Sequence, residues 1–162
     1  MGGYEIVEQL RREQFTAVAE ATLGVADIGP WLPAAYEAIA RTIVAQGKAV
    51  AGAPFARYHQ VGDGRFVVEA GFPVSTPIQP ADQVRPSMLP SGPAACTIHT
   101  GPYDLMEPAY LALVDWITAH NAAPAGDPWE IYYSDPTVQP DPATWKTEVV
   151  QPYTPLPAPT GE

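Results

Sequence analysis

Two segments of this chain, residues 30–59 and 104–133, align without a gap at an offset of 74 residues (from 30 to 104). The identical pairs are Ala35/Ala109, Tyr36/Tyr110, Ala38/Ala112, Ile43/Ile117, Ala45/Ala119, Ala49/Ala123, Ala51/Ala125, Gly52/Gly126, Pro54/Pro128 and Tyr58/Tyr132. They include Gly, Pro and Tyr as well as common alanines. Because a repeat is one structural unit used twice, it constrains the fold more than any other feature. We expect two copies of a helix followed by a strand.

Each copy carries apolar residues at three- and four-residue steps, over 31–43 and over 106–117. This spacing predicts a helix with one buried face. Pro30 and Pro102 indicate the helix starts, where a missing N–H costs little. Residues that tolerate a left-handed cap follow both helices at equivalent positions: Gly47 and Asn121.

Strand-like segments flank each helix. They are 4–10, 15–22, 53–59 and 66–74 in the first half, and 84–89, 94–100, 129–134 and 145–150 in the second. The pattern predicts an α+β domain of two strand-helix-strand-strand units, about 4–74 and 83–151, with pseudo-twofold symmetry. We expect antiparallel sheets and two long helices around a central cleft. The domain is predicted to span 1–152, and the Pro-rich tail, 153–162, to be extended or disordered.

Charge and cysteine content narrow the function. With 18 acidic and 8 basic residues the net charge is −10, which repels a phosphate backbone and favours a cationic ligand. We therefore expect no direct nucleic-acid binding. The single Cys96 excludes an intrachain disulfide, and His59 and His120 lack partners at ligand spacing, so neither a metal nor a cofactor is expected. No apolar run could span a bilayer and no signal peptide is evident, which predicts a soluble cytoplasmic protein.

Two motifs in the second half are more specific. They are LPSGPAACTIHTGPY at 89–103 and PWEIYYSDP at 128–136. With the repeat, they resemble the GyrI-like small-molecule-binding family, whose fold also forms the effector-binding domain of AraC-type and multidrug-responsive MerR-type bacterial regulators. The resemblance extends to about residue 152 and implies a cleft lined by aromatics, with a buried glutamate on a central strand, here Glu130. In those regulators a DNA-binding module comes first. A strand beginning by about Tyr4 leaves no room for one, so we expect a stand-alone form.

The residues around Glu130 support a site independently of the resemblance. Strand alternation puts Glu130 and Tyr132 on one face, whereas the first copy has Ala56 beside Tyr58 at the matching positions. Burying a carboxylate costs several kcal/mol unless it is compensated. A lipophilic cation stacked on aromatic rings would supply both the opposite charge and the contact. The alternative is that Glu130 pairs with an arginine or a tyrosine hydroxyl and serves only the fold.

Further ligand-binding candidates come from neighbouring segments. Trp145 is either a wall of the cleft or an ordinary core residue, and Tyr103 either reaches the cleft or fixes the helix start. His99 leaves the same strand end as Tyr103, although a lone histidine is more often structural than a base. We expect Tyr36 and Tyr110 to pack in the core between helix and sheet.

Three functions follow from these residues. The first is binding of planar apolar or cationic drugs and toxins. The second is hydrolysis, because some stand-alone GyrI-like proteins open cyclopropane-bearing DNA alkylators. In that reaction Glu130 would act as general base on water, and Tyr103 or Tyr132 would stabilise the developing charge. The third is a protein partner such as DNA gyrase, which some family members bind. This ranks last because the acidic residues never form a dense run.

Overall fold

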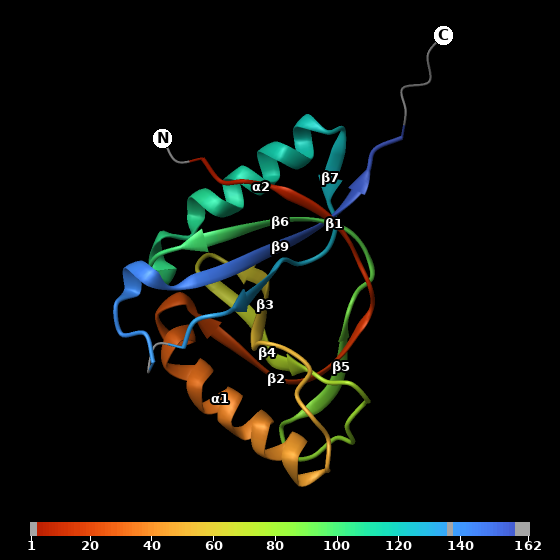
Figure 1. Ribbon diagram of the computed structural model, residues 1–162, viewed down its shortest axis with the longest axis vertical. Coiled ribbons are helices and arrows are strands. Elements are labelled where there is room, and N and C mark those ends of the chain that lie inside the picture. Colours follow the sequence, from red (N-terminus) through yellow and green to blue (C-terminus); the bar gives the residue numbers. More distant parts are fainter. Residues whose placement is uncertain (1–2, 136–137, 158–162) are drawn as a thin grey trace.

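The computed structural model describes residues 3–135 and 138–157, which form one curled sheet with two α-helices on its outside (Figure 1). The strands are β1 (Val7–Arg11), β2 (Gln14–Gly24), β3 (Phe55–Gly62), β4 (Arg65–Pro73), β5 (Arg85–Leu89), β6 (Gly92–Thr100), β7 (Ala122–Pro124), β8 (Trp129–Tyr132) and β9 (Lys146–Pro155). The helices are α1 (Val25–Ala45), α2 (Glu107–Ala119) and the short 3₁₀ turns η1 (Tyr103–Leu105) and η2 (Pro142–Thr144). The predicted α+β class is confirmed.

All described strand pairs are antiparallel, in the order β1-β6-β9-β8-β3-β4-β2-β5, with β7 paired to β9. Strand β1 pairs with β6 while β2 pairs with β5, and only two residues separate β1 from β2 or β5 from β6. These two short connections join the ends of the sheet, which therefore curls round on itself, as the right-hand side of Figure 1 shows.

The two halves meet at β3 and β8, the matching strands of the two copies. Ala56 pairs directly with Glu130, its own equivalent in the repeat, with Phe55 opposite Ile131 on one side and Arg57 opposite Trp129 on the other. The pseudo-twofold axis therefore passes between Ala56 and Glu130. The predicted halves form one continuous sheet through this pair.

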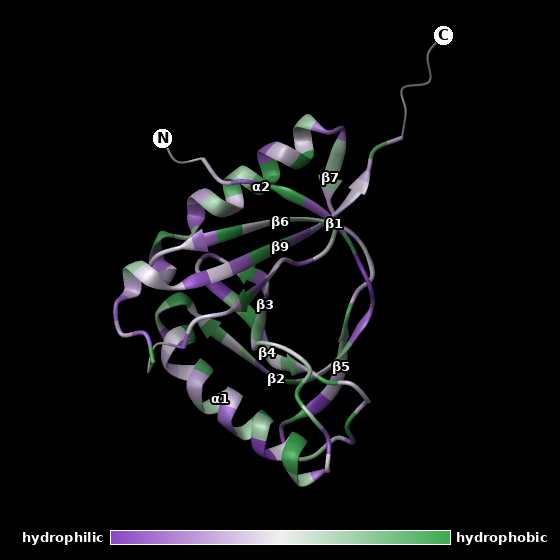
Figure 2. Cartoon of the chain, in the orientation of Figure 1, coloured by the Kyte–Doolittle hydropathy of each residue, from purple (hydrophilic) through white to green (hydrophobic). Residues whose placement is uncertain are grey.

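The helices bury the faces that the repeat predicts. The buried residues of α1 are Ala35, Ile39 and Ile43, and those of α2 are their equivalents Ala109, Leu113 and Ile117. Figure 2 shows hydrophobic and hydrophilic residues alternating along both helices. Both predicted caps adopt the left-handed conformation, with φ of 70° at Gly47 and 57° at Asn121.

Three apolar clusters hold these layers together. One lies under α2 and includes Leu113 and Val149, and a second lies under α1 and includes Ile39. The third contains Trp129 and Val150, which are paired across β8 and β9. The next residues along these strands face the helices, so Trp129 and Val150 point the other way, and this cluster lies inside the curl of the sheet. Glu130 and Trp129 therefore point to opposite faces of the sheet. None of the helices in 3–135 and 138–157 is long and apolar enough to cross a membrane.

The helix starts differ from the prediction. Helix α1 begins at Val25, so Pro30 lies inside it, because the N–H of Val25 bonds to the carbonyl of Gly64 in the β3–β4 turn at 3.0 Å. Pro102 precedes the 3₁₀ turn η1, and α2 follows only at Glu107.

The last predicted strand, 145–150, ends five residues too early. Strand β9 continues to Pro155, pairs there with β7, and buries Tyr153 in the α2 cluster. Proline is tolerated in this pairing because β7 is a short strand at an edge. The part of the predicted tail at 158–162, and Pro136 of the second motif, lie outside the described residues.

Candidate functional site

Glu130 lies at the pseudo-twofold axis on the helix side of the sheet, with a relative exposure of 9%. The hydroxyl of Tyr132 donates to Oε1 at 2.7 Å, and the hydroxyl of Tyr110, from α2, donates to Oε2. The described residues place no arginine or lysine within ion-pair distance of the carboxylate. Glu130 is thus held by tyrosines, as one of the two sequence alternatives proposed, and its charge is not neutralised.

A third tyrosine, Tyr58, extends this hydrogen-bond chain. The hydroxyls of Tyr58 and Tyr132, equivalent in the two copies, are 2.7 Å apart. Because Tyr132 gives its proton to Glu130, Tyr58 must be the donor to Tyr132. The order is therefore Tyr58 to Tyr132 to Glu130, with Tyr110 donating from the other side.

Burial controls the ionisation of this cluster. Loss of solvent raises the pKa of Glu130, and the hydrogen bonds from Tyr110 and Tyr132 and the nearby His99 oppose the shift only in part. Burial and the neighbouring carboxylate also raise the pKa of the Tyr58, Tyr110 and Tyr132 hydroxyls. The tyrosines therefore remain donors at neutral pH, and Glu130 is a stronger base than a solvated glutamate.

An aromatic stack leads from this cluster to the surface. The ring of Tyr103 meets that of Tyr132 edge-on, with centroids 5.5 Å apart, and stacks on Trp145 at 4.7 Å. Tyr103 is 38% exposed, whereas Tyr132 is part of the buried hydrogen-bond chain. The structure thus brings together Glu130, Tyr132, Tyr103 and Trp145, which lie up to 42 residues apart (103 to 145) in the sequence.

His99 has a structural role in this arrangement. The carbonyl of Pro102 only accepts, so Nε2 carries the proton that bonds to it at 2.9 Å, and Nδ1 accepts from Tyr4 at 2.9 Å. Between His99 and Pro102, Gly101 adopts a φ of 140°, where a side chain would be strained. His99 therefore fixes the turn that delivers Tyr103, and a direct ligand contact by His99 stays a prediction.

Two residues near Glu130 were not identified from the sequence. Tyr110 was expected to pack in the core, yet its hydroxyl binds the carboxylate. Its equivalent Tyr36 donates instead to the carbonyl of Phe55 at 2.8 Å, because Ala56 offers no carboxylate. Thr147 pairs with Tyr132 in the next strand, and its buried hydroxyl has no partner within the described part of the chain. The only sign of either residue in the sequence was a polar group at a position that the pattern predicts to be buried.

The predicted cleft at Glu130 stays a prediction. Two cavities among the described residues lie elsewhere, one lined by 9–14 and one by residues that include Arg57 and His59. Since Glu130 is buried beneath the tyrosines, a ligand could reach it only if the Tyr103–Trp145 stack moved. Cys96 is buried on the opposite face, where loss of solvent raises the pKa of its thiol to about 11, as expected for an unreactive residue.

Comparison with known proteins supports the family resemblance. The model of the GyrI-like small molecule binding domain matches residues 19–154. No curated protein shows significant similarity to the sequence. The crystal structure of the EcmrR C-terminal domain is similar, with a TM-score of 0.81 at 20% identity over 94% of this chain and 99% of that one. The chain spans only 58% of EcmrR as solved with DNA.

Two further solved structures share the fold. A hydrolase from Listeria innocua has a TM-score of 0.67 at 14% identity, over 95% of this chain and 94% of that one. SAV2435, solved with tetraphenylphosphonium, has a TM-score of 0.60 at 11% identity, over 94% of each chain. Identities this low establish the architecture alone, whereas the family model covers most of the sequence. The chain belongs to the family of GyrI-like small-molecule-binding domains.

Proposed function

We propose that this domain binds lipophilic cations with aromatic groups, and that Glu130 supplies the countercharge. The observation that carries the proposal is a buried carboxylate whose described partners are all tyrosine hydroxyls. Hydroxyls satisfy the oxygens but leave the negative charge uncompensated, and burial raises the pKa of Glu130 as a result. A cation would relieve this penalty.

The aromatic stack supports the same ligand class. Tyr103 and Trp145 form a stacked pair beside Tyr132, and rings of this kind attract cations and stack on aromatic ligands. Tyr103 is the exposed member of the pair. We therefore infer that the Tyr103–Trp145 pair forms the solvent-facing side of the site at Glu130. A ligand would either stack on these two rings or displace them. SAV2435, which has the same fold, was solved with a cation of this class.

The test is a titration with tetraphenylphosphonium, read by quenching of tryptophan fluorescence. Glu130→Gln should weaken binding at least ~10-fold because it removes the countercharge and keeps the shape. Glu148→Gln is a matched control, since Glu148 is also 9% exposed and accepts a hydrogen bond from a tyrosine, Tyr133, but faces the inside of the curl. Equal binding by wild type and Glu130→Gln would contradict the proposal, and so would equal losses in both variants.

Hydrolysis is the second candidate, favoured by the raised basicity of Glu130. A carboxylate with a raised pKa is a better general base on water, and the hydroxyl of Tyr103 or Tyr132 lies close enough to stabilise developing negative charge. Proteins of this fold from Listeria innocua are described as hydrolases. The test is incubation with a cyclopropane-bearing alkylator and detection of the ring-opened, water-added product. Turnover that Glu130→Gln abolishes would support catalysis, and a stoichiometric loss of the compound would contradict it.

A further inference from the structure

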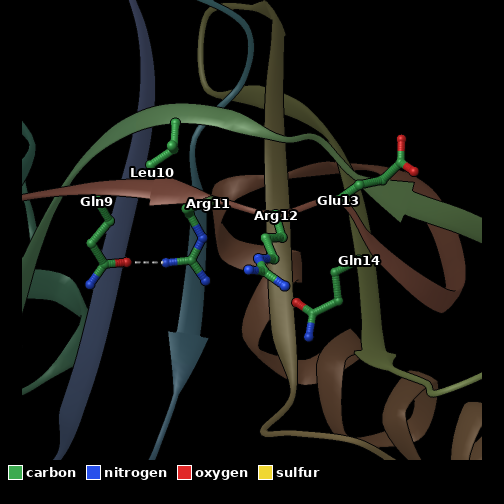
Figure 3. A pocket seen from close by; sticks show the side chains of 6 residues that line it. All are labelled: Gln9, Leu10, Arg11, Arg12, Glu13 and Gln14. Carbon is green, nitrogen blue, oxygen red and sulfur yellow. Dashed lines mark hydrogen bonds between the residues drawn. The ribbon is translucent and has the colours of Figure 1, made fainter.

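We propose that the cavity at the bend between β1 and β2 is a second binding site, which takes a small oxyanion such as a carboxylate or a phosphate. The cavity has a volume of about 500 Å³ and is lined by six consecutive residues, Gln9 to Gln14. In Figure 3, Gln9, Arg11, Arg12 and Gln14 extend to one side of the chain, and Leu10 and Glu13 extend to the other.

The chemistry of this side is that of an anion site. Two guanidinium groups and two carboxamides present N–H donors in one place, and guanidinium groups bind planar oxyanions through paired hydrogen bonds. The ion pairs found in the described residues are His59–Asp127 and Arg85–Glu20, so neither Arg11 nor Arg12 is neutralised there. The chain has 18 acidic residues against 8 basic ones, so acids to pair with were abundant. The adjacent positive charges of Arg11 and Arg12 repel each other, and an anion bound between them would offset this repulsion.

Arg11 is held in position before any ligand arrives. Its Nη1 donates to Oε1 of Gln9 at 2.6 Å and contacts Sγ of Cys96 at 4.0 Å. The guanidinium carbon lies 5.7 Å from the ring centroid of Trp129, in a cation–π contact. These contacts use one edge of the group, so its remaining N–H groups can bind a ligand at a reduced entropic cost.

The neighbouring part of the same sheet face also has a surplus of donors. Trp129 is 1% exposed, yet its Nε1 has no hydrogen-bond partner in the described part of the chain. Arg57, its partner across the β3–β8 pair, has a buried Nε in the same condition. Both groups can only donate, but Arg57 lies beside Glu20, Glu69 and Asp127 in the other cavity, so only the Trp129 Nε1, next to Arg11, bears on the anion site.

This site is separate from the one at Glu130. Trp129 and Glu130 are adjacent in β8 and therefore face opposite sides of the sheet. One face would bind a cation and the other an anion. The second site does not depend on the function proposed above, and either can fail without the other.

The test is isothermal titration calorimetry of the full chain with pyrophosphate and with citrate. The variant R11Q/R12Q should bind at least ~10-fold more weakly than wild type, because two charge-assisted contacts are lost. The control R41Q/R65Q removes two exposed arginines elsewhere, has the same net charge, and should bind like wild type. The variant Glu130→Gln should also bind like wild type. Binding by either anion supports the site, and which anion binds identifies a phosphate or a carboxylate ligand.

Two results would overturn the proposal. One is no saturable binding of either anion by wild type up to about 10 mM. The other is an equal loss in R11Q/R12Q and R41Q/R65Q, since the effect would then come from net charge alone. If R11Q/R12Q loses its near-ultraviolet circular dichroism, the single variant R12Q replaces it, because Arg12 is exposed and its loss should not disturb folding. Unchanged affinity in a folded R12Q would equally refute the site.

Discussion

The pairing of Ala56 with Glu130 makes a quantitative prediction about the substitution Ala56→Glu. The two positions are direct neighbours across β3 and β8, and Ala56 is fully buried. Side chains in such a pair begin about 5 Å apart, so two carboxylates repel by about 3 kcal/mol at an effective dielectric constant of about 20. The pair can also take up one proton, so this value is an upper limit. Ala56→Glu should therefore lower the free energy of unfolding by up to about 3 kcal/mol beyond the cost of its size.

The size effect is measured separately with Ala56→Gln, which adds the same volume without the charge. The double variant A56E/E130A moves the carboxylate to the equivalent position, where Tyr36 and Tyr58 replace Tyr110 and Tyr132. This double variant should regain the free energy of unfolding that repulsion between the two carboxylates removes in Ala56→Glu. The assay is urea unfolding at neutral pH and again at acidic pH, where protonation removes the repulsion. Equal stability of the Glu and Gln variants at neutral pH would refute the reasoning.

Three other outcomes follow from the site and the core. Because burial raises the pKa of Glu130, the carboxylate protonates at a higher pH than a solvated one, so tetraphenylphosphonium affinity should fall early on acidification in wild type and stay flat in Glu130→Gln. Tyr132→Phe should cost about 1–3 kcal/mol in urea unfolding because it strands the hydroxyl of Tyr58, while Tyr103→Phe, at the exposed ring, should change stability by less than about 0.5 kcal/mol. Tyr153→Ala should cost about 3 kcal/mol by the same assay, because β9 extends to Pro155 and buries this ring, and a near-zero effect would contradict that burial.

Local patterns predicted the helices well. A buried stripe needs only a spacing of three and four residues, and a left-handed cap needs only Gly or Asn, so both features are readable within one segment. The same reasoning put Glu130 and Tyr132 on one strand face, where the structure has them. These features require no knowledge of distant contacts.

Features that depend on distant contacts were mispredicted or missed. The start of α1 is set by a bond from Val25 to Gly64, which no local rule contains. The prolines around Tyr153 led to a last strand that ends at 150, but β7 offers an edge that accepts them. Tyr110 lies on the buried stripe of α2, and periodicity cannot distinguish a tyrosine packed in the core from one whose hydroxyl reaches a carboxylate.

The position of the axis explains why the two copies differ at Ala56 and Glu130 while Tyr58 and Tyr132 stay identical. A residue on the axis meets its own equivalent, so a charge kept in both copies would repel itself, and the pair Ala56 and Glu130 avoids this. Residues off the axis meet other partners and can stay identical, as Tyr58 and Tyr132 have. Both copies of that tyrosine then serve one carboxylate, Tyr132 directly and Tyr58 through it. Duplication thus supplies a chain of two tyrosine hydroxyls that ends on a single carboxylate at the centre of this domain.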